Sequence, residues 1–231
     1  MIDITPMDDP WHLDFADLDS EPMHYRNYAV RAFRLSPSQF LLRGVVDDRK
    51  AGKNWVPWDD RPMVIHHMVL DMVVSYPGLV IESAKAVVDQ HPQPHCPSIE
   101  PHYQGLVGLS IARGFTHKVR ELFGGPKGCT HVTALVQAMA PVAMQATWGM
   151  DQMNRRDAFA AEGHDVEREM LPPRSTEDRV HSSMRSINTC HVFAEDGLYV
   201  SRLRQGIANP VPLTVQRRLA EHGLAPETFN E

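Results

Sequence analysis

The sequence is poor in cysteine, in long apolar runs and in clustered positive charge. It has three cysteines among 231 residues, an odd number that argues against a disulfide scaffold and for a reducing compartment. No C-x-x-C pair occurs, so the spacing typical of many structural zinc sites is missing. No run of about 18 apolar residues occurs either, so no membrane-spanning helix is predicted.

The charge pattern excludes further classes of protein. The chain has 23 Lys and Arg residues against 29 Asp and Glu residues, a net charge of −6, and no basic stripe. Nucleic-acid-binding proteins need clustered cations, so no nucleic-acid partner is expected. The opening segment, MIDITPMDDPWHLDFADLDSE, is acidic and lacks the basic and apolar regions of a signal peptide. We therefore expect a cytoplasmic protein.

The distribution of apolar residues predicts one main domain with an appendage at each end. A hydrophobic fraction of 42% is normal for a globular protein. We expect an acidic N-terminal arm (residues 1–23), a single domain (24–205) and a C-terminal tail (206–231) with a short helix over about 212–222. A homodimer is the default expectation because soluble oligomers are commonly symmetric, although no sequence feature bears on it.

The N-terminal half of the domain has the pattern of antiparallel strands. Residues 24–47 are rich in Val, Phe, Tyr and Leu around Ser36-Pro37-Ser38, which predicts a β-hairpin. Residues 63–89 flank Pro77-Gly78 in the same way and predict a second hairpin around a type II turn or a longer loop.

A working register for the second hairpin pairs Tyr76 with Leu79. Asp71 then faces Ala84, and Asp71 and Glu82 become diagonal neighbours, about 7–8 Å apart. The predicted face carries Ile65, His67, Val69, Asp71, Val73, Val80, Glu82 and Ala84. The opposite face carries His66, Met68, Leu70, Met72 and Lys85. Titratable groups gathered on one face suit general acid–base catalysis, and the open alternative is a face that is simply solvated.

The second half of the domain is predicted to be mainly helical. Residues 114–123 form a short helix, and a long helix begins at Thr130, with a kink at Pro141. Residues 187–203, INTCHVFAEDGLYVSRL, predict one more strand or a strand with a turn at Asp196-Gly197. Because strands precede helices, we expect an α+β fold in which N-terminal antiparallel β-hairpins form a sheet that is packed by C-terminal helices.

The stretch GGPKGCTHVTALV places a cysteine at the start of the long helix. Thr130 is a good N-cap residue, and Cys129 comes just before it, where free amides and the helix dipole favour an anion. Cys129 and His131 also suggest a thiol nucleophile with its base. Their side chains should point apart, however, if both follow helical geometry.

Each cysteine has a histidine within two positions along the chain, which leaves a metal site open. A zinc ion can draw on cysteine and histidine ligands. The candidate ligands are Cys96, Cys129, His131 and His191.

Several segments together resemble a known family. The pieces IHHMVLDM, IESAKA, HCPSIEPHYQGLVGLSIARGF, VRELFGGPKGCTHVTALV and NTCHVFAEDG resemble the domain-of-unknown-function family 2889 over about residues 24–200. The resemblance implies a role in the bacterial breakdown of aromatic compounds. The activity it implies is that of a cofactor-independent carbon–carbon lyase that releases formaldehyde from a phenylcoumaran, a lignin-derived dimer, and leaves a stilbene.

Such a reaction asks for two acid–base groups and an apolar slot for two aromatic rings, without a metal or a redox cofactor. The acid–base candidates are His66, His67, Asp71, Glu82 and Tyr103. The candidates for binding the small aromatic substrate are Trp55, Trp58, Cys129, Thr130 and His131. Trp55 and Trp58 lie in a proline-rich loop and either cover the ligand or close the end of the sheet. Two alternatives stay open: a Cys/His metal-dependent hydrolase with zinc, and a non-catalytic protein that binds an aromatic ligand.

Overall fold

The computed structural model describes residues 23–53, 55–112, 114–169, 175, 177–178, 183–184, 186–207 and 209–225. The chain forms two compact units, residues 1–154 and residues 155–231, so this division and the boundary expected at residue 205 fall at different places. Except for Met23, the expected acidic arm lies outside the described residues.

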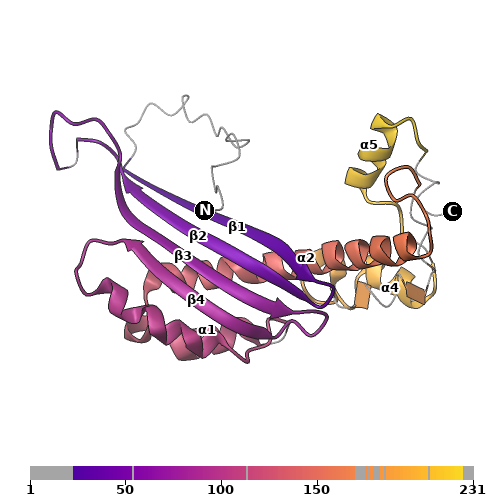
Figure 1. Ribbon diagram of the computed structural model, residues 1–231, viewed down its shortest axis with the longest axis horizontal. Helices are drawn as coiled ribbons and strands as arrows, with labels where there is room; N and C mark the ends of the chain where they lie inside the picture. The colour runs from indigo at the N-terminus through magenta and orange to yellow at the C-terminus, as the bar shows by residue number, and fades with distance from the viewer. Residues whose placement is uncertain are drawn as a thin grey trace. The chain divides into compact units, whose positions relative to one another are not determined.

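The first unit contains a four-stranded antiparallel sheet with strand order β1-β2-β3-β4. The strands are β1 (His24–Ser36), β2 (Gln39–Lys50), β3 (Met63–Ser75) and β4 (Ile81–Gln90). Both predicted hairpins are confirmed and join in one sheet, as Figure 1 shows. Helices follow the strands in sequence, so the predicted α+β class is also confirmed.

The register of the second hairpin differs from the working register by one residue. Asp71 pairs with Lys85 rather than with Ala84. The reason is a β-bulge: the register shifts between Val73 and Val74, and Glu82 is the extra residue on β4. The shift reverses the faces expected for Ala84, which is buried, and for Lys85, which lies opposite Asp71 on the other face.

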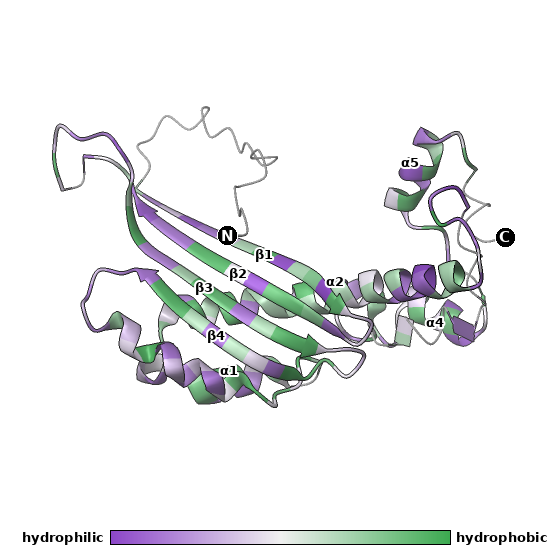
Figure 2. Ribbon diagram, in the orientation of Figure 1, coloured by the Kyte–Doolittle hydropathy of each residue, from purple (hydrophilic) through white to green (hydrophobic). Residues whose placement is uncertain are grey.

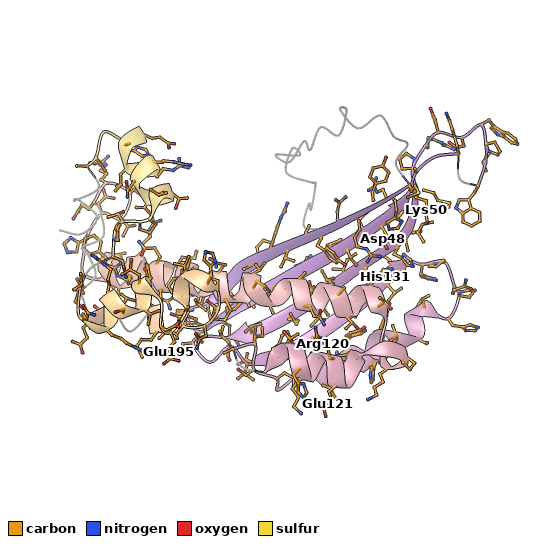
Figure 3. The ribbon with its side chains drawn as sticks, turned by 180° about the vertical axis from the view of Figure 1, so that it is seen from behind. Asp48, Lys50, Arg120, Glu121, His131 and Glu195 are labelled. Carbon is orange, nitrogen blue, oxygen red and sulfur yellow. The ribbon has the colours of Figure 1, made fainter. Side chains whose placement is uncertain are left out.

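Helices cover one face of the sheet, and the core lies between the two layers (Figures 1 and 3). The covering elements are the 3₁₀-helix η1 (Cys96–Leu106), α1 (Phe115–Phe123), η2 (Gly125–Lys127) and α2 (Thr130–Ala161). The fully buried core side chains include Phe40, Leu42, Val46, Met68, Leu70, Met72, Val119, Leu135 and Met139. In Figure 2 hydrophobic stretches make up much of the strands, hydrophilic bands cross them near their middle, and the C-terminal end of β2 is hydrophilic.

The long helix α2 lies close to β2. A Cβ atom added to Gly44 would be 2.5 Å from Met139 Sδ and 3.0 Å from Leu135 Cδ1, so the missing side chain of Gly44 makes room for the helix. The predicted start at Thr130 is confirmed, and the helix continues through Pro141 to Ala161. The first turn of α2 is thereby fixed over the end of the sheet where β2 finishes.

The regular elements described in the second unit are helices joined by turns. It contains η3 (His191–Phe193), α4 (Leu198–Arg204) and α5 (Leu213–Glu221). The strand predicted over residues 187–203 is wrong: the segment folds into local turns, in which the Asn188 N–H donates to the Phe193 carbonyl, and then into α4. The short helix predicted near the C-terminus is confirmed as α5. No helix in the described part of the chain is long and apolar enough to cross a membrane.

Candidate acid–base site

A row of polar side chains crosses three strands at one end of the sheet. Arg26 on β1 pairs with Asp48 on β2, and Asp48 pairs with His66 on β3. Paired residues of neighbouring strands lie on the same face, here the face covered by helices. His131, in the first turn of α2, lies over this row. Figure 3 shows Asp48 and His131 near one another at the end of the sheet marked by Lys50.

Asp48 is a fully buried carboxylate that stays ionised. It is 0% exposed. Arg26 Nε donates to Oδ1 and Arg26 Nη2 donates to Oδ2, each at 2.5 Å, and His24 Nε2 lies 3.3 Å from Oδ1. Burial on its own would raise the pKa of Asp48, but the hydrogen bonds and charge of Arg26, with the help of His24, hold that pKa well below its usual range.

Two imidazoles share one oxygen of this carboxylate. His66 Nδ1 and His131 Nε2 each lie 3.1 Å from Asp48 Oδ2, and the two rings stack with their centroids 3.7 Å apart. Burial lowers the pKa of both histidines and outweighs the opposing effect of Asp48, while the proximity of His66 lowers the pKa of His131 further. Both rings are therefore neutral at neutral pH.

The neighbouring carboxylate also selects the tautomer of each ring. An ionised carboxylate only accepts hydrogen bonds, so the ring nitrogen that faces Asp48 carries the proton. That leaves a lone pair on His66 Nε2 and on His131 Nδ1. Both side chains are partly accessible, with 16% and 18% of their surface exposed. The site thus contains two partly exposed imidazole bases.

Cys129 adjoins this pair of histidines. Its Sγ lies 3.8 Å from His131 Nδ1, so the expectation that the two side chains point apart is wrong. The reason is that Cys129 lies outside α2. Its carbonyl accepts the first helical bond, from the Thr133 N–H at 2.9 Å, which makes Cys129, rather than Thr130, the N-cap residue.

Tyr103 holds the start of α2 in place. Its side chain is 0% exposed. The hydroxyl accepts the Cys129 N–H at 3.0 Å and lies 3.0 Å from both the Cys129 carbonyl oxygen and Thr133 Oγ1. Burial raises the pKa of Tyr103. This expected acid–base residue therefore sits where it positions Cys129, with its hydroxyl already engaged.

The other three expected acid–base residues do not converge. Each has a separate partner outside the row of Asp48: His67 Nδ1 lies 3.1 Å from Asp89, Arg43 binds Asp71 through two bonds of 2.7 and 2.6 Å, and Gln39 donates to Glu82 at 2.6 Å. His67 and Asp71 lie on the face of β3 opposite to His66, because neighbouring residues along a strand alternate between faces.

The expected substrate-binding tryptophans lie in the loop between β2 and β3. Trp55 is 72% exposed and Trp58 is 86% exposed, so neither is buried over the end of the sheet. The loop leaves β2 two residues after Asp48 and therefore starts beside the site. Thr130 begins α2 between Cys129 and His131.

Of the four expected zinc ligands, Cys129 and His131 lie together. Cys96 is partly buried against the core. His191 belongs to η3 in the second unit, where it lines a shallow cavity of about 420 Å³.

A different trio has the donor set of a metal site, but its geometry suits a cation poorly. One donor atom each from Asp48, His66 and His131 lies within 4.8 Å of the others. However, Arg26 already binds both oxygens of Asp48 and places a positive charge beside the space that a cation would fill. The arrangement fits proton transfer better than metal binding.

Sequence reasoning missed Asp48, Arg26 and His24. A signal for Asp48 was present, because it continues the alternation of the buried residues Phe40, Leu42, Gly44 and Val46 along β2. A carboxylate at the next position of a core-facing series must find a charged or hydrogen-bonding partner. That position therefore marks a polar cluster.

Comparisons with known proteins give a family without an assigned activity. No curated protein and no solved structure matches the chain significantly. Residues 24–145 match the family described as "Protein of unknown function (DUF2889)". The matched region is more than half of the chain and contains the whole row from Arg26 to His131. The protein is therefore a member of the DUF2889 family.

Proposed function

We propose that the protein is an enzyme that transfers protons through His66 and His131, which Asp48 orients, and that it cleaves a phenylcoumaran-type aromatic dimer with release of formaldehyde. The observation that carries the acid–base part is the buried, ionised carboxylate of Asp48 with two neutral, partly exposed imidazoles on one of its oxygens. The substrate class rests on what the family resemblance of the segments quoted above implies, a role in the breakdown of aromatic compounds.

The roles of the three residues follow from their hydrogen bonds. Asp48 has both oxygens engaged by Arg26, so it orients the imidazoles and stabilises their protonated forms rather than acting as the base. His131 Nδ1 and His66 Nε2 carry the lone pairs that do not face Asp48. Because burial lowers their pKa values, both imidazoles are unprotonated at neutral pH, which is the form in which each can accept one proton as a general base.

The proposed reaction needs two such proton transfers. One imidazole takes the proton of the phenol that lies para to the benzylic ether carbon. The electron pair of the phenolate oxygen moves through the ring, the bond between the benzylic carbon and the ether oxygen breaks, and a quinone methide forms. The second imidazole takes the proton of the neighbouring CH2OH group, the carbon–carbon bond breaks, and formaldehyde leaves. The electron pair of that bond restores the aromatic ring and forms the stilbene double bond, while the two protons return to the two phenolic oxygens.

The loop between β2 and β3 supplies the aromatic surface that this substrate asks for. Trp55 and Trp58 are exposed and lie on the loop that starts beside Asp48. Stacking of aromatic rings contributes about 0.5–1.5 kcal/mol beyond area burial. In the proposal, these side chains hold one ring of the dimer while the other ring reaches the imidazoles.

A metal-dependent hydrolase is the second candidate, because three donor atoms lie within 4.8 Å of one another. The hydrogen bonds of Arg26 to both oxygens of Asp48 weigh against it. A protein that binds an aromatic ligand without converting it is the third candidate, supported only by the exposed tryptophans.

The test is incubation of metal-analysed protein with a phenylcoumaran dimer while formaldehyde and stilbene absorbance are followed together. We expect equal amounts of both products without added metal. His66→Gln and His131→Gln should each lower kcat by about a hundredfold, whereas His117→Gln, at an exposed position of α1, is the matched control and should leave it unchanged.

Each other outcome has its own meaning. Recovery of unchanged dimer from a protein that binds it supports the non-catalytic reading. A stoichiometric metal whose removal abolishes activity supports the metalloenzyme. If the protein neither binds nor converts the dimer, the proposed substrate is wrong.

A further inference from the structure

Cys129, His131 and Asp48 form a line of thiol, imidazole and carboxylate. Cys129 Sγ lies 3.8 Å from His131 Nδ1, and His131 Nε2 lies 3.1 Å from Asp48 Oδ2. The three residues come from the turn before α2, from the first turn of α2 and from β2. Each nitrogen of one imidazole thus faces one of the other two groups, which is the arrangement that thiol enzymes use for a nucleophile, its base and the residue that orients the base.

The protonation state of His131 suits the role of base for this thiol. Asp48 is an anion with Arg26 on both oxygens, so the ring nitrogen that lies 3.1 Å from it, His131 Nε2, carries the ring proton. The lone pair of Nδ1 then faces the thiol. When Nδ1 takes the thiol proton, the imidazolium that forms is stabilised by the charge of Asp48.

The backbone of Cys129 is held from several sides, which fixes the direction of its side chain. Its carbonyl accepts bonds from the Thr133 N–H and the Tyr103 hydroxyl, and its N–H donates to Tyr103. The side chain is partly exposed. The first N–H groups of α2 have no acceptor within the helix, and such amides stabilise a developing oxyanion.

We propose that Cys129 is the nucleophile of a thiol-dependent acyl transfer that takes acyl groups from carboxylic esters or thioesters and passes them to water. The thiol proton moves to His131 Nδ1 while sulfur bonds to the carbonyl carbon. The bond to the leaving group breaks, and the leaving group takes the proton from His131. Water then adds to the thioester and gives its proton to His131, the carbon–sulfur bond breaks, and the thiol regains the proton as the acid is released.

This activity goes beyond the proposed lyase and stands without it, because formaldehyde release requires no covalent bond to the protein. Its test therefore uses a different probe, p-nitrophenyl acetate, with the full chain. We expect a burst of p-nitrophenolate with one acetyl group per chain, located on the peptide that contains Cys129 by mass spectrometry.

Three variants separate an activated thiol from a merely accessible one. Cys129→Ala should abolish the burst, and His131→Gln should slow acylation by at least about a hundredfold. Cys190 is more exposed than Cys129, so Cys190→Ala is the matched control and should keep the full burst. An acetyl group found on Cys190, or acylation of Cys129 at an unchanged rate in a folded His131→Gln variant, would overturn the proposal.

A second measurement needs no variant and so does not depend on whether one folds. The unmodified protein is treated with limiting iodoacetamide at neutral pH, and the labelled peptides are quantified. If the thiol is activated, Cys129 reacts at least about tenfold faster than Cys190 despite its lower exposure. Equal or faster labelling of Cys190 would contradict the proposal.

Discussion

At the scale of single residues, Asp48 organises the site. It is the common partner of His24, Arg26, His66 and His131, and it has essentially no exposed surface. A buried carboxylate with that many donors is held in one orientation. The positions of both bases therefore depend on one side chain that never has to touch the substrate.

Replacement of Asp48 should destabilise the protein because it leaves the charge of Arg26 without its partner. We expect Asp48→Asn to lower the free energy of unfolding by about 2 kcal/mol, less than for a fully buried pair, because the Arg26 side chain is 35% exposed. Asp47 on the same strand pairs with Arg49 at the surface, and Asp47→Asn should cost less than about 1 kcal/mol. Urea unfolding of both variants checks this, and equal losses would contradict the special role of Asp48.

The lowered pKa values of His66 and His131 predict a dependence of stability on pH. The unfolded chain binds protons at these histidines from about pH 6.5 downward, before the folded protein does. The free energy of unfolding should therefore fall as the pH drops from about 6.5 to the lower pKa values of the folded state. Asp48 adds a loss at more acidic pH, because the stability it contributes disappears as the pH falls through its lowered folded pKa.

Unfolding in urea at a series of pH values measures this effect. The His66→Gln/His131→Gln double variant should show a flatter curve just below pH 6.5, while His117→Gln should keep the slope of the unmodified protein. A protein that becomes more stable on acidification in this range would contradict the assignment of neutral, buried imidazoles.

At this scale, the sequence indicated which residue types are unusual, but it did not indicate which side chains contact one another. It singled out His66, Cys129 and His131, because histidines within an apolar strand and a cysteine at a helix start are unusual. It favoured Asp71 and Glu82 over Asp48, because the partner of a carboxylate lies on another strand. Strand pairing is a long-range property, and local pattern does not reveal that Arg43 neutralises Asp71 or that Arg26 reaches Asp48.

At the scale of elements, the close approach of α2 to β2 determines where His131 lies. The approach depends on Gly44, where an added Cβ would overlap Met139. A helix that moved away from the sheet would carry its first turn away from Asp48.

Two glycine substitutions should therefore have opposite effects. Gly44→Ala should destabilise the protein by about 2 kcal/mol through overpacking. Gly149 lies on the exposed side of α2, and an added Cβ would have no atom near it. Gly149→Ala should therefore stabilise the protein by about 0.5–1 kcal/mol through helix propensity. Thermal unfolding of both variants checks this: the midpoint temperature should fall for Gly44→Ala and rise for Gly149→Ala. A neutral Gly44→Ala would mean that the flexible side chain of Met139 moves aside without cost.

The elements themselves were largely predictable, whereas their exact pairing was not. Alternating strands, turn residues and the Gly-rich helix start are local signals, and they located β1 to β4, α1 and α2. The bulge at Glu82 and the length of the turn before it depend on tertiary packing, so the register was missed by one residue. Residues 187–203 have strand-like composition, but their hydrogen bonds close locally, and the predicted strand did not form.

At the scale of the whole molecule, the site belongs entirely to the first unit. All residues from Arg26 to His131 lie within residues 1–154, which also contain the sheet and its core. Units with their own core can fold independently. We expect the fragment of residues 1–154 to unfold in one cooperative transition by circular dichroism and to keep the preferential labelling of Cys129. A fragment without a cooperative transition would show that residues 155–231 are needed for folding.

The stacking of His66 on His131 has a spectroscopic consequence. An aromatic ring shields nuclei above its face, so each imidazole should shift the carbon-bound protons of the other upfield in a proton NMR spectrum. Among the other histidines that the structure describes, His102 and His164 pack against a phenylalanine ring, and the rest lack an aromatic neighbour and should keep ordinary shifts. The shifted proton signals therefore report on the two imidazoles of the site, and the titration of each ring can be followed separately without a substrate.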